Sequence, residues 1–189
     1  MCQQLVDKKD NSNKIFGVIP YLAPEVLSKK PYTKESDVYS FGMIMWEHTT
    51  GKNPFHDRPH NSSLISDILN GIRPQVTDDT PEFYAELMKK CWDHSPENRP
   101  TVQEIYDCLY EYWRSGITEE NKEIISSAET KRQEIIKSDK FLLDTKNYKH
   151  HPGSFYTSRL LNESIEQAES SNVLSQNFST LISDPFKNE

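Results

Sequence analysis

The feature that most constrains this chain is an apolar stretch early in it, at residues 38–46. Ser36 precedes the stretch and Gly51 follows it, which predicts a helix over residues 37–50 that Ser36 caps and Gly51 closes. Apolar side chains lie on more than one face of this helix: Val38, Phe41, Ile44, Met45 and Trp46. Such a helix belongs inside a fold rather than on its surface. We therefore expect it at the centre of a larger unit.

Three further helices are predicted downstream, each with its own start or stop signal. One spans about residues 63–70 and ends at Gly71, and the next spans residues 81–92 with a proline in its opening turn. The last begins at a capping box formed by Thr101 and Glu104. Its apolar residues recur at i, i+4 and i+8: Ile105, Leu109 and Trp113. Because no alternating strand pattern is present, we expect a small, mainly α-helical fold.

The character of the chain changes beyond Gly116, where Ser, Asn, Glu and Lys dominate. We expect one helical unit over residues 1–114 and a polar tail over residues 115–189 that is disordered outside a possible helix at about residues 118–143. Residues 118–143 could form one more helix with a thin apolar stripe, although a charged, solvated helix without a partner fits equally well. The stripe consists of Ile125, Ala128, Ile135 and Ile136.

Composition excludes several classes of partner and location. The net charge is -7 and the pI is near 5.4, which argues against a nucleic-acid groove or an anionic membrane surface. No stretch approaches the roughly 20 apolar residues that a bilayer span needs, and residues 1–14 lack the apolar core of a secretory signal. Three scattered cysteines suit neither a disulfide framework nor a zinc site. We expect reduced thiols and a cytoplasmic location.

Three motifs in one order resemble the C-terminal lobe of the protein kinase superfamily. "GVIPYLAPEVL" resembles the end of a kinase activation segment, "SDVYSFGMIMWEHTTGKNPF" its central helix, and "LMKKCWDHSPENRPT" the run into its last helix. The "MWE" and "CW…RPT" features are most similar to the tyrosine-kinase-like group. In the tail, "HPGSFYTSRLLN" resembles tails of kinases expanded in mycorrhizal fungi. The resemblance covers residues 1–114 and implies the helical C-terminal lobe of the protein-kinase-like fold, without its N-terminal lobe and catalytic loop.

The resemblance implies structural roles for several residues. Ala23, Pro24 and Glu25 match the closing Ala-Pro-Glu motif, and Arg99 matches the family's characteristic arginine. It implies that Glu25 and Arg99 pair inside the lobe, where losing one partner should cost about 3–5 kcal/mol; two unrelated surface charges remain the alternative. Asp37 resembles the acidic residue that accepts hydrogen bonds from the catalytic loop, and it also suits a helix start. Trp46 and Trp92 are also predicted to have structural roles.

Residues 17–21 match the loop that contacts the residue after the phosphoacceptor in kinases. Its candidate substrate residues are Gly17, Val18, Pro20 and Tyr21. Serine/threonine kinases usually carry Thr after the glycine, but Val18 has no hydroxyl. Tyr21 stands where tyrosine kinases carry Trp. The acceptor hydroxyl is therefore left open between Ser/Thr and Tyr.

Phosphoryl transfer also requires a Gly-rich loop, a phosphate-binding lysine, and H-R-D and D-F-G motifs. None of these motifs occurs in the sequence, and His56-Asp57-Arg58 is only a scrambled lookalike. We therefore assign no catalytic, cofactor-binding or metal residue, and expect ATP and magnesium only in an intact family member. Met1 matches a point within the activation segment, so the start could be genuine or mispredicted.

Other chemistry-bearing residues are expected to be structural or solvated. Asp78 and Asp79 are adjacent turn residues whose side chains diverge, and His150 and His151 lack further ligands nearby. Cys91 has no histidine base in any motif and is expected in the core.

Two functional hypotheses follow. The first is a fragment of a protein kinase, inactive alone, whose intact form would transfer the γ-phosphoryl of ATP to a protein substrate. The alternative is a non-catalytic interaction module that binds a protein partner, as in a pseudokinase-like scaffold. Since the central helix is apolar on nearly all sides, residues 1–114 alone should expose a large apolar patch and aggregate.

Overall fold

The computed structural model describes residues 14–115, 119–138 and 149–171 of the chain. The loop expected over the first dozen residues and the disorder expected at residues 172–189 lie outside these ranges. The first elements are β1 (Phe16–Gly17), η1 (Ile19–Tyr21), α1 (Pro24–Leu27), α2 (Lys34–Thr50) and α3 (Ser62–Leu69). They are followed by α4 (Glu82–Cys91), η2 (Pro96–Asn98), α5 (Val102–Ser115), α6 (Glu119–Lys137) and β2 (Arg159–Leu160), and by a helix over residues 162–171.

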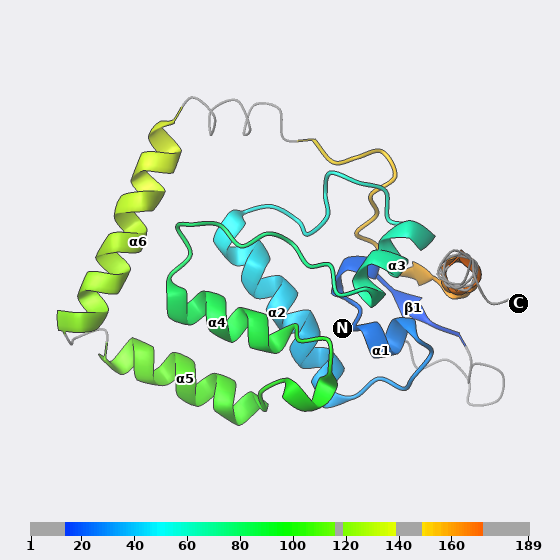
Figure 1. Ribbon diagram of the computed structural model, residues 1–189, viewed down its shortest axis with the longest axis horizontal. Coiled ribbons are helices and arrows are strands. Elements are labelled where there is room, and N and C mark those ends of the chain that lie inside the picture. The colour runs from blue at the N-terminus through cyan, green and yellow to red at the C-terminus, as the bar shows by residue number, and fades with distance from the viewer. Residues whose placement is uncertain (1–13, 116–118, 139–148, 172–189) are drawn as a thin grey trace, which may run out of the picture.

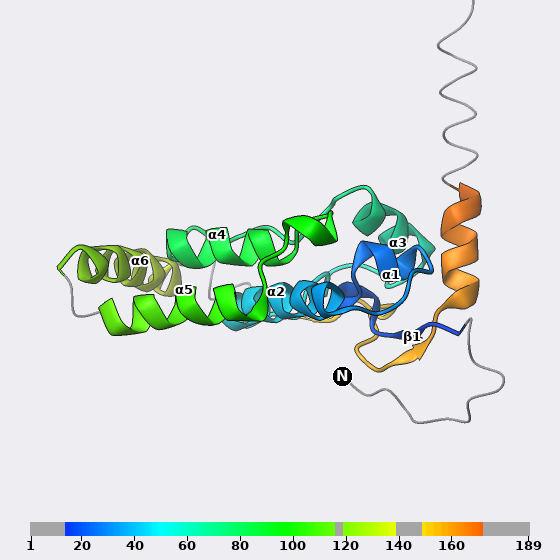
Figure 2. The ribbon, with the colours of Figure 1, turned by 90° about the horizontal axis from the view of Figure 1, so that it is seen from below.

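Helix α2 runs through the middle of the molecule, with α4 and α5 beside it (Figures 1 and 2). The helices α2 and α4 approach closely at Gly42, where an added Cβ would lie 2.9 Å from the Cβ of Cys91. Tyr39 and Met43 of α2 are fully buried. The predicted central helix is therefore present, and the fold is mainly helical.

Two apolar residues of α2 depart from the prediction. Phe41 is 36% exposed and Ile44 is 52% exposed, so one stripe of the helix is left uncovered by the described residues. Full burial of the helix would require a further segment on that side, which the described residues do not supply.

Helix α2 also begins earlier than predicted. Thr33, not Ser36, is its N-cap: the Thr33 hydroxyl accepts from the Ser36 N–H, and the Ser36 hydroxyl accepts from the Thr33 N–H. Ser36 occupies the third helical position of this reciprocal box, because the preceding Lys34 and Glu35 are good helix formers. Gly51 closes the helix in the left-handed conformation with φ of 66°, as predicted.

The capping box predicted at Thr101 is present. One residue of its helix, Trp113, was expected on the buried face and lies on the exposed one. Glu104 accepts from the Thr101 N–H at 2.7 Å, and Thr101 accepts from the Glu104 N–H at 3.2 Å. Ile105 is buried, whereas Trp113 is 78% exposed. Eight residues turn a helix by about 80° beyond two full turns. Trp113 consequently joins an exposed stripe, with Tyr110, rather than the core.

The helix suggested within residues 118–143 is present as α6, which crosses the ends of α4 and α5 (Figure 1). Ala128 and Ile135 are half-buried, while Ile125 and Ile136 are exposed. Residues 139–143 lie outside the described ranges. In the part of the chain that the structure describes, no helix combines the length and apolar character needed to cross a membrane.

Part of the tail departs from the expected disorder, since residues 149–171 fold back onto the helical unit (Figure 2). Strand β2 pairs antiparallel with β1, with Phe16 opposite Leu160 and Gly17 opposite Arg159. The side chains of Leu161, Ile165 and Ala168 are fully buried. Strands of two residues are too short for an alternating pattern to reveal, and therefore the sequence did not predict them.

Candidate functional site

The predicted substrate loop, residues 17–21, is a short turn attached to α2. Its backbone closes with the Tyr21 N–H donating to the Val18 carbonyl at 2.9 Å. Ser40 of α2 donates its hydroxyl to the Tyr21 carbonyl at 2.7 Å, and the Tyr21 hydroxyl donates to a Glu47 carboxylate oxygen at 2.7 Å. Both the backbone and the side chain of Tyr21 are thus fixed to one helix. Of the predicted loop residues, Pro20 is buried and Gly17, Val18 and Tyr21 are half-buried.

The Ala-Pro-Glu motif follows this loop directly and forms the start of α1. Ala23 is the N-cap in extended conformation, and Pro24 occupies the opening turn, where its fixed φ suits a helix. Ala23, Pro24 and Glu25 are all buried. The motif therefore aims Glu25 into the interior, immediately after the loop.

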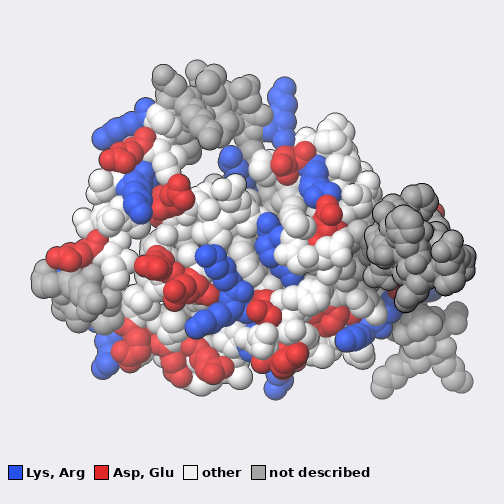
Figure 3. Space-filling model, in the orientation of Figure 1, with Lys and Arg blue, Asp and Glu red and all other residues white. Residues whose placement is uncertain are grey.

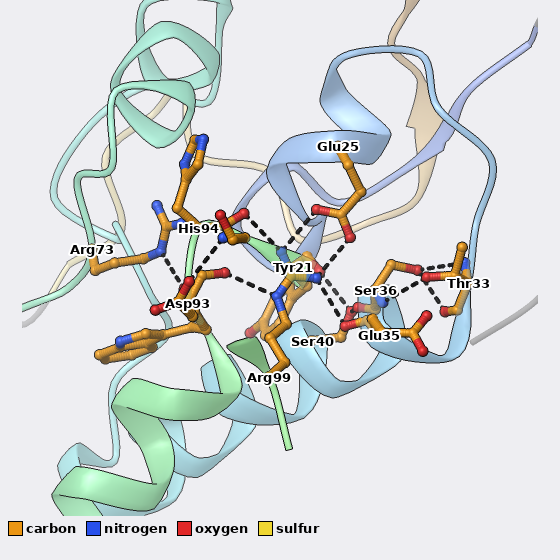
Figure 4. A network of polar contacts seen from close by, with 12 residues as sticks. Tyr21, Glu25, Thr33, Glu35, Ser36, Ser40, Arg73, Asp93, His94 and Arg99 are labelled. Atoms are coloured by element: carbon orange, nitrogen blue, oxygen red, sulfur yellow. Dashed lines mark hydrogen bonds and ion pairs between the residues drawn. The ribbon is translucent and has the colours of Figure 1, made fainter. Parts of the chain in front are cut away.

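Glu25 meets Arg99 there, as predicted (Figure 4). Arg99 Nη1 donates to Glu25 Oε1 at 2.6 Å, and Arg99 Nη2 donates to Glu25 Oε2 at 2.8 Å. The exposed fraction of the Arg99 side chain is 0% and that of Glu25 is 7%. The two parallel charge-assisted bonds satisfy charges that would be expensive to bury alone. We call this pair the Glu25–Arg99 clasp.

The remaining Arg99 donors are also satisfied, by backbone carbonyls from two segments. Nε donates to the Asp93 carbonyl at 2.9 Å, Nη1 to the Glu35 carbonyl at 2.9 Å, and Nη2 to the His94 carbonyl at 3.2 Å. Glu35 lies at the start of α2, whereas Asp93 and His94 follow α4. One guanidinium therefore ties together α1, the start of α2 and the turn after α4.

Tyr39 of α2 lies beneath the clasp and was missed by the sequence reasoning. The Arg99 guanidinium carbon lies 5.2 Å from the Tyr39 ring centroid, and that of Arg73 lies 5.0 Å from it. Such contacts are favourable cation–π interactions. Burial raises the pKa of Tyr39 to about 12, so the phenol is neutral. Its buried hydroxyl has no hydrogen-bond partner. The polar contacts of Tyr39 are therefore those of its ring with the two guanidiniums.

Arg73 carries a second, half-buried guanidinium that no motif indicated. It donates to the carbonyls of Trp92 at 3.0 Å, Ile68 at 3.0 Å and Ile72 at 2.8 Å. Burial holds its pKa below the usual arginine range, and the neighbouring Arg99 acts in the same direction. The contacts of Arg73 with Tyr39 and with three carbonyls are made by the fold, and no spacing in the sequence predicts them.

The predicted structural tryptophans are buried. The Trp46 indole N–H donates to the Gln75 carbonyl at 2.7 Å, and Trp92 is 5% exposed at the end of α4. Cys91 is fully buried, and burial raises its pKa to about 12. The thiol is therefore a packing group, as predicted, and not a nucleophile.

The other candidates occupy the surface. Asp37 is exposed in the first turn of α2, where its charge favours the helix start. Asp78 is exposed and Asp79 half-exposed in a turn. His150 and His151 are exposed, but they belong to the docked tail: the His151 N–H donates to the His56 carbonyl at 2.8 Å. Across the described ranges, no three His, Cys, Asp or Glu side chains gather in a group that could hold a metal.

Acidic and basic side chains intersperse over the face shown in Figure 3, with acidic groups along the edge formed by α5. This face carries no extended basic patch of the kind that nucleic acids require.

The chain is similar in sequence to several known proteins. The family model for protein tyrosine and serine/threonine kinases matches residues 1–109. Cyclic GMP-binding protein C of Dictyostelium discoideum is 41% identical over 92 residues, covering 47% of this chain and 4% of that protein. Serine/threonine-protein kinase STY46 of Arabidopsis thaliana is 35% identical over 95 residues, covering 50% of this chain and 16% of that protein. A chain of the AtMLKL3 tetramer, solved by cryo-EM, is 40% identical with a TM-score of 0.46, covering 49% of this chain and 17% of that chain.

The chain thus spans less than a fifth of the length of each of these relatives. The family match covers the substrate loop, both partners of the clasp and the central helix, and it stops before α6 and the docked tail. This chain belongs to the protein tyrosine and serine/threonine kinase family.

Proposed function

We propose that this chain supplies the peptide-docking lobe of a protein kinase that transfers the γ-phosphoryl of ATP to a protein hydroxyl. The observation that carries the proposal is the Glu25–Arg99 clasp, which fixes the chain four residues after the loop. A loop that must present a flexible peptide to a reacting group has to be held rigidly, because small displacements reduce the rate strongly. The clasp and the contacts of Tyr21 with α2 provide that rigidity.

The phosphoryl-transfer step itself is not assigned to these residues. The sequence holds no Gly-rich loop, phosphate-binding lysine, H-R-D or D-F-G motif, and no acidic cluster in the described ranges fits magnesium. We propose that the chain alone is inactive and that ATP and magnesium bind to residues of an intact family member. The contribution of this chain is then to bind and orient the protein substrate.

The acceptor hydroxyl is proposed to be Ser or Thr, within the tyrosine-kinase-like group. The name of the relative STY46, a serine/threonine-protein kinase, supports this choice. Val18 offers no hydroxyl to the reacting residues, so any contact that selects the acceptor must come from elsewhere. A cytoplasmic location is proposed from the reduced, buried thiol of Cys91.

An interaction module without catalysis is the second candidate, and one observation favours it. The exposed aromatic stripe on α5 is large: Tyr106 is 57%, Tyr110 is 41% and Trp113 is 78% exposed. Exposed aromatic side chains of this kind are enriched at protein interfaces.

A chimeric kinase distinguishes the two candidates. The matched segment of STY46 is replaced by residues 14–114 of this chain, and phosphorylation of a protein substrate is measured with ATP and magnesium. If this lobe is a working docking half, the folded chimera phosphorylates the substrate, and the same chimera with Glu25→Gln is less active or less stable. A chimera whose H-R-D aspartate is replaced by Ala serves as the inactive control.

The decisive result is a chimera that shows a cooperative thermal transition but no activity above that control. It would overturn the kinase proposal and favour the interaction module.

A further inference from the structure

The docked tail occupies a continuous surface made of two parts. The first part is the loop at residues 53–60, which follows α2. The second part is β1 with the preceding Ile15, together with Lys29 just after α1. We call these two parts the tail-docking surface. The surface lies within the family match, which ends at residue 109, whereas the tail that occupies it begins beyond that match, at residue 149.

His60 organises the first part. It is 2% exposed, and its Nδ1 accepts from the Phe155 N–H at 3.1 Å. The same Nδ1 lies 3.0 Å from the Phe155 carbonyl, and Nε2 lies 3.1 Å from the Phe55 carbonyl. The His60 N–H donates to the Gly153 carbonyl at 2.8 Å, and Arg159 donates to the His60 carbonyl. Ring, N–H and carbonyl of one residue are therefore all committed to holding the loop and tail together.

Two further contacts fit the tail closely to the same loop. The Tyr156 hydroxyl donates to the Pro54 carbonyl at 3.0 Å, and its ring meets the His60 ring edge-on at 4.9 Å. At Gly153 an added Cβ would lie 2.9 Å from the Cβ of Pro59. The backbone approach is thus too close for any side chain at position 153 without a shift of the loop.

The second part combines strand pairing with apolar burial. The Leu161 N–H donates to the Ile15 carbonyl at 2.9 Å, and the Ile15 N–H donates to the Asn162 side chain at 2.9 Å. Leu161 and Ile165 are 0% exposed and belong to the main hydrophobic core. At the far end, Lys29 pairs with Glu169 at 2.8 Å on the surface.

We propose that the tail-docking surface is a binding site for an extended segment followed by a helix, and that residues 149–171 occupy it in cis. Strand addition to a sheet edge, with pockets for alternate side chains, is a general way of binding a peptide. Here β2 takes the edge of β1 that runs directly into the substrate loop. While the tail is docked, no other polypeptide can pair with that edge.

The occupancy is favoured because the tail is tethered. A segment in the same chain as its site has a higher effective concentration there than a free peptide at micromolar concentration, so the free peptide cannot compete. Detaching the tail requires the loss of its apolar anchors. Replacing both Leu161 and Ile165 by Asp should shift the docking equilibrium by about 100-fold or more, given the transfer free energy of each buried side chain.

The experiment compares binding of one fluorescent peptide, with the sequence of residues 149–171, to full-length variants by fluorescence anisotropy. We expect saturable binding to the full-length L161D/I165D chain, measured on its monomeric fraction from size-exclusion chromatography, and none to the wild-type chain, whose site is occupied. A matched control is the full-length L160D chain, because Leu160 is adjacent but 51% exposed; it should behave like the wild type. A labelled peptide that itself carries L161D/I165D should bind to neither.

Binding of the labelled peptide to neither full-length chain, or equally to both, would overturn the proposal. To guard against a variant that fails to fold, hydrogen exchange of the wild-type chain is measured as well. The amides of Leu161 and Phe155 must be protected in it, and rapid exchange at both would also overturn the proposal. Gly153→Ala, whose added Cβ would crowd Pro59 of the loop and His151 of the tail, should raise exchange at Phe155 without loss of the thermal transition.

The inference rests on the proposed function in one respect, namely that residues 17–21 face the substrate. A second chimera, extended through residue 171, tests this consequence: L161D/I165D should lower the KM for a peptide substrate relative to the intact tail. Peptide binding without a change in KM would retain the docking site and reject its effect on the substrate loop. An inactive chimera would count only against the kinase proposal.

Discussion

The two ends of the segment 14–29 are held by different forces. Downstream of the loop at residues 17–21, the Glu25–Arg99 clasp uses two buried charges that satisfy each other, and backbone carbonyls accept the remaining Arg99 donors. Upstream, Phe16 and Gly17 are held by strand pairing and by the buried side chains of the tail. Loss of one partner of a buried ion pair leaves the other charge buried without compensation, which costs about 3–5 kcal/mol in a single step. The free energy from apolar burial decreases gradually, roughly in proportion to the apolar area that becomes exposed. The downstream anchor is thus suited to permanent structure and the upstream anchor to exchange.

The largest effect is expected when the upstream anchor is removed entirely. Residues 1–114 expressed alone should aggregate, because they lose Leu161, Ile165 and Ala168 from the core while Phe41 and Ile44 stay exposed. Size-exclusion chromatography with light scattering measures this against the full-length chain. A monomeric fragment with a cooperative thermal transition would show that the tail is dispensable to the fold.

The second largest effect is expected when the downstream anchor, the Glu25–Arg99 clasp, is broken. Glu25→Ala leaves the Arg99 guanidinium buried without its carboxylate and should lower the free energy of unfolding by about 3–5 kcal/mol. Urea unfolding of the full-length chain measures it. Arg114→Ala is the matched control, because its pair with Glu111 is exposed and should contribute no more than roughly 1 kcal/mol. Equal effects of the two substitutions would contradict the buried clasp.

A single tail anchor should have a smaller but still clear effect. Leu161→Ala removes a fully buried side chain and should cost about 2–5 kcal/mol. Its neighbour Leu160 is 51% exposed, and Leu160→Ala should change the free energy of unfolding by less than about 0.5 kcal/mol. Because the two leucines are adjacent, the difference between them isolates the docking contact from helix or strand propensity.

The smallest expected effect is a pH dependence confined to the upstream anchor. Burial lowers the pKa of His60 from its ordinary value of 6.5, and the charges of Arg159 and His150 act in the same direction. The carbonyls of Phe155 and Phe55, which lie beside its two ring nitrogens, oppose this shift. Docking is therefore complete above about pH 6.5 and weakens as the pH falls, by at most about 1.4 kcal/mol per pH unit. Hydrogen exchange of the Phe155 amide between pH 7.5 and 5.5 measures it.

The His60→Gln variant tests whether this slope belongs to His60. It should flatten the dependence, and the slope that remains reports His56, whose pKa burial also lowers. An unchanged slope in the variant would assign the effect elsewhere.

Much of the downstream anchor could be predicted from the sequence, because its signals are local. Pro24 at a helix start, the Thr101–Glu104 capping box and the resemblance of three ordered motifs together indicated the helices and the clasp. Tyr39 and Arg73 were not predicted, since the ring of Tyr39 contacts two guanidiniums that lie far from it in the sequence. Trp113 was placed on the wrong face because the helix advances past the core over eight residues.

The docked tail could not be predicted for a similar reason. Leu161, Ile165 and Ala168 follow helical spacing at i, i+4 and i+7, which is the one signal that was available. Three apolar residues among Ser, Glu and Gln are too few to form a core by themselves, so composition favoured disorder. Their burial depends on the edge of β1 and the loop around His60, which lie about a hundred residues or more away in the chain.

The sequence by itself determined the family, the helices and the identity of the two buried charges, because helix signals act over a few residues and charges buried together require one another. Only the tertiary structure decided what covers each side of the loop at residues 17–21. Covering a surface depends on which distant segment reaches it, and no local pattern contains that information.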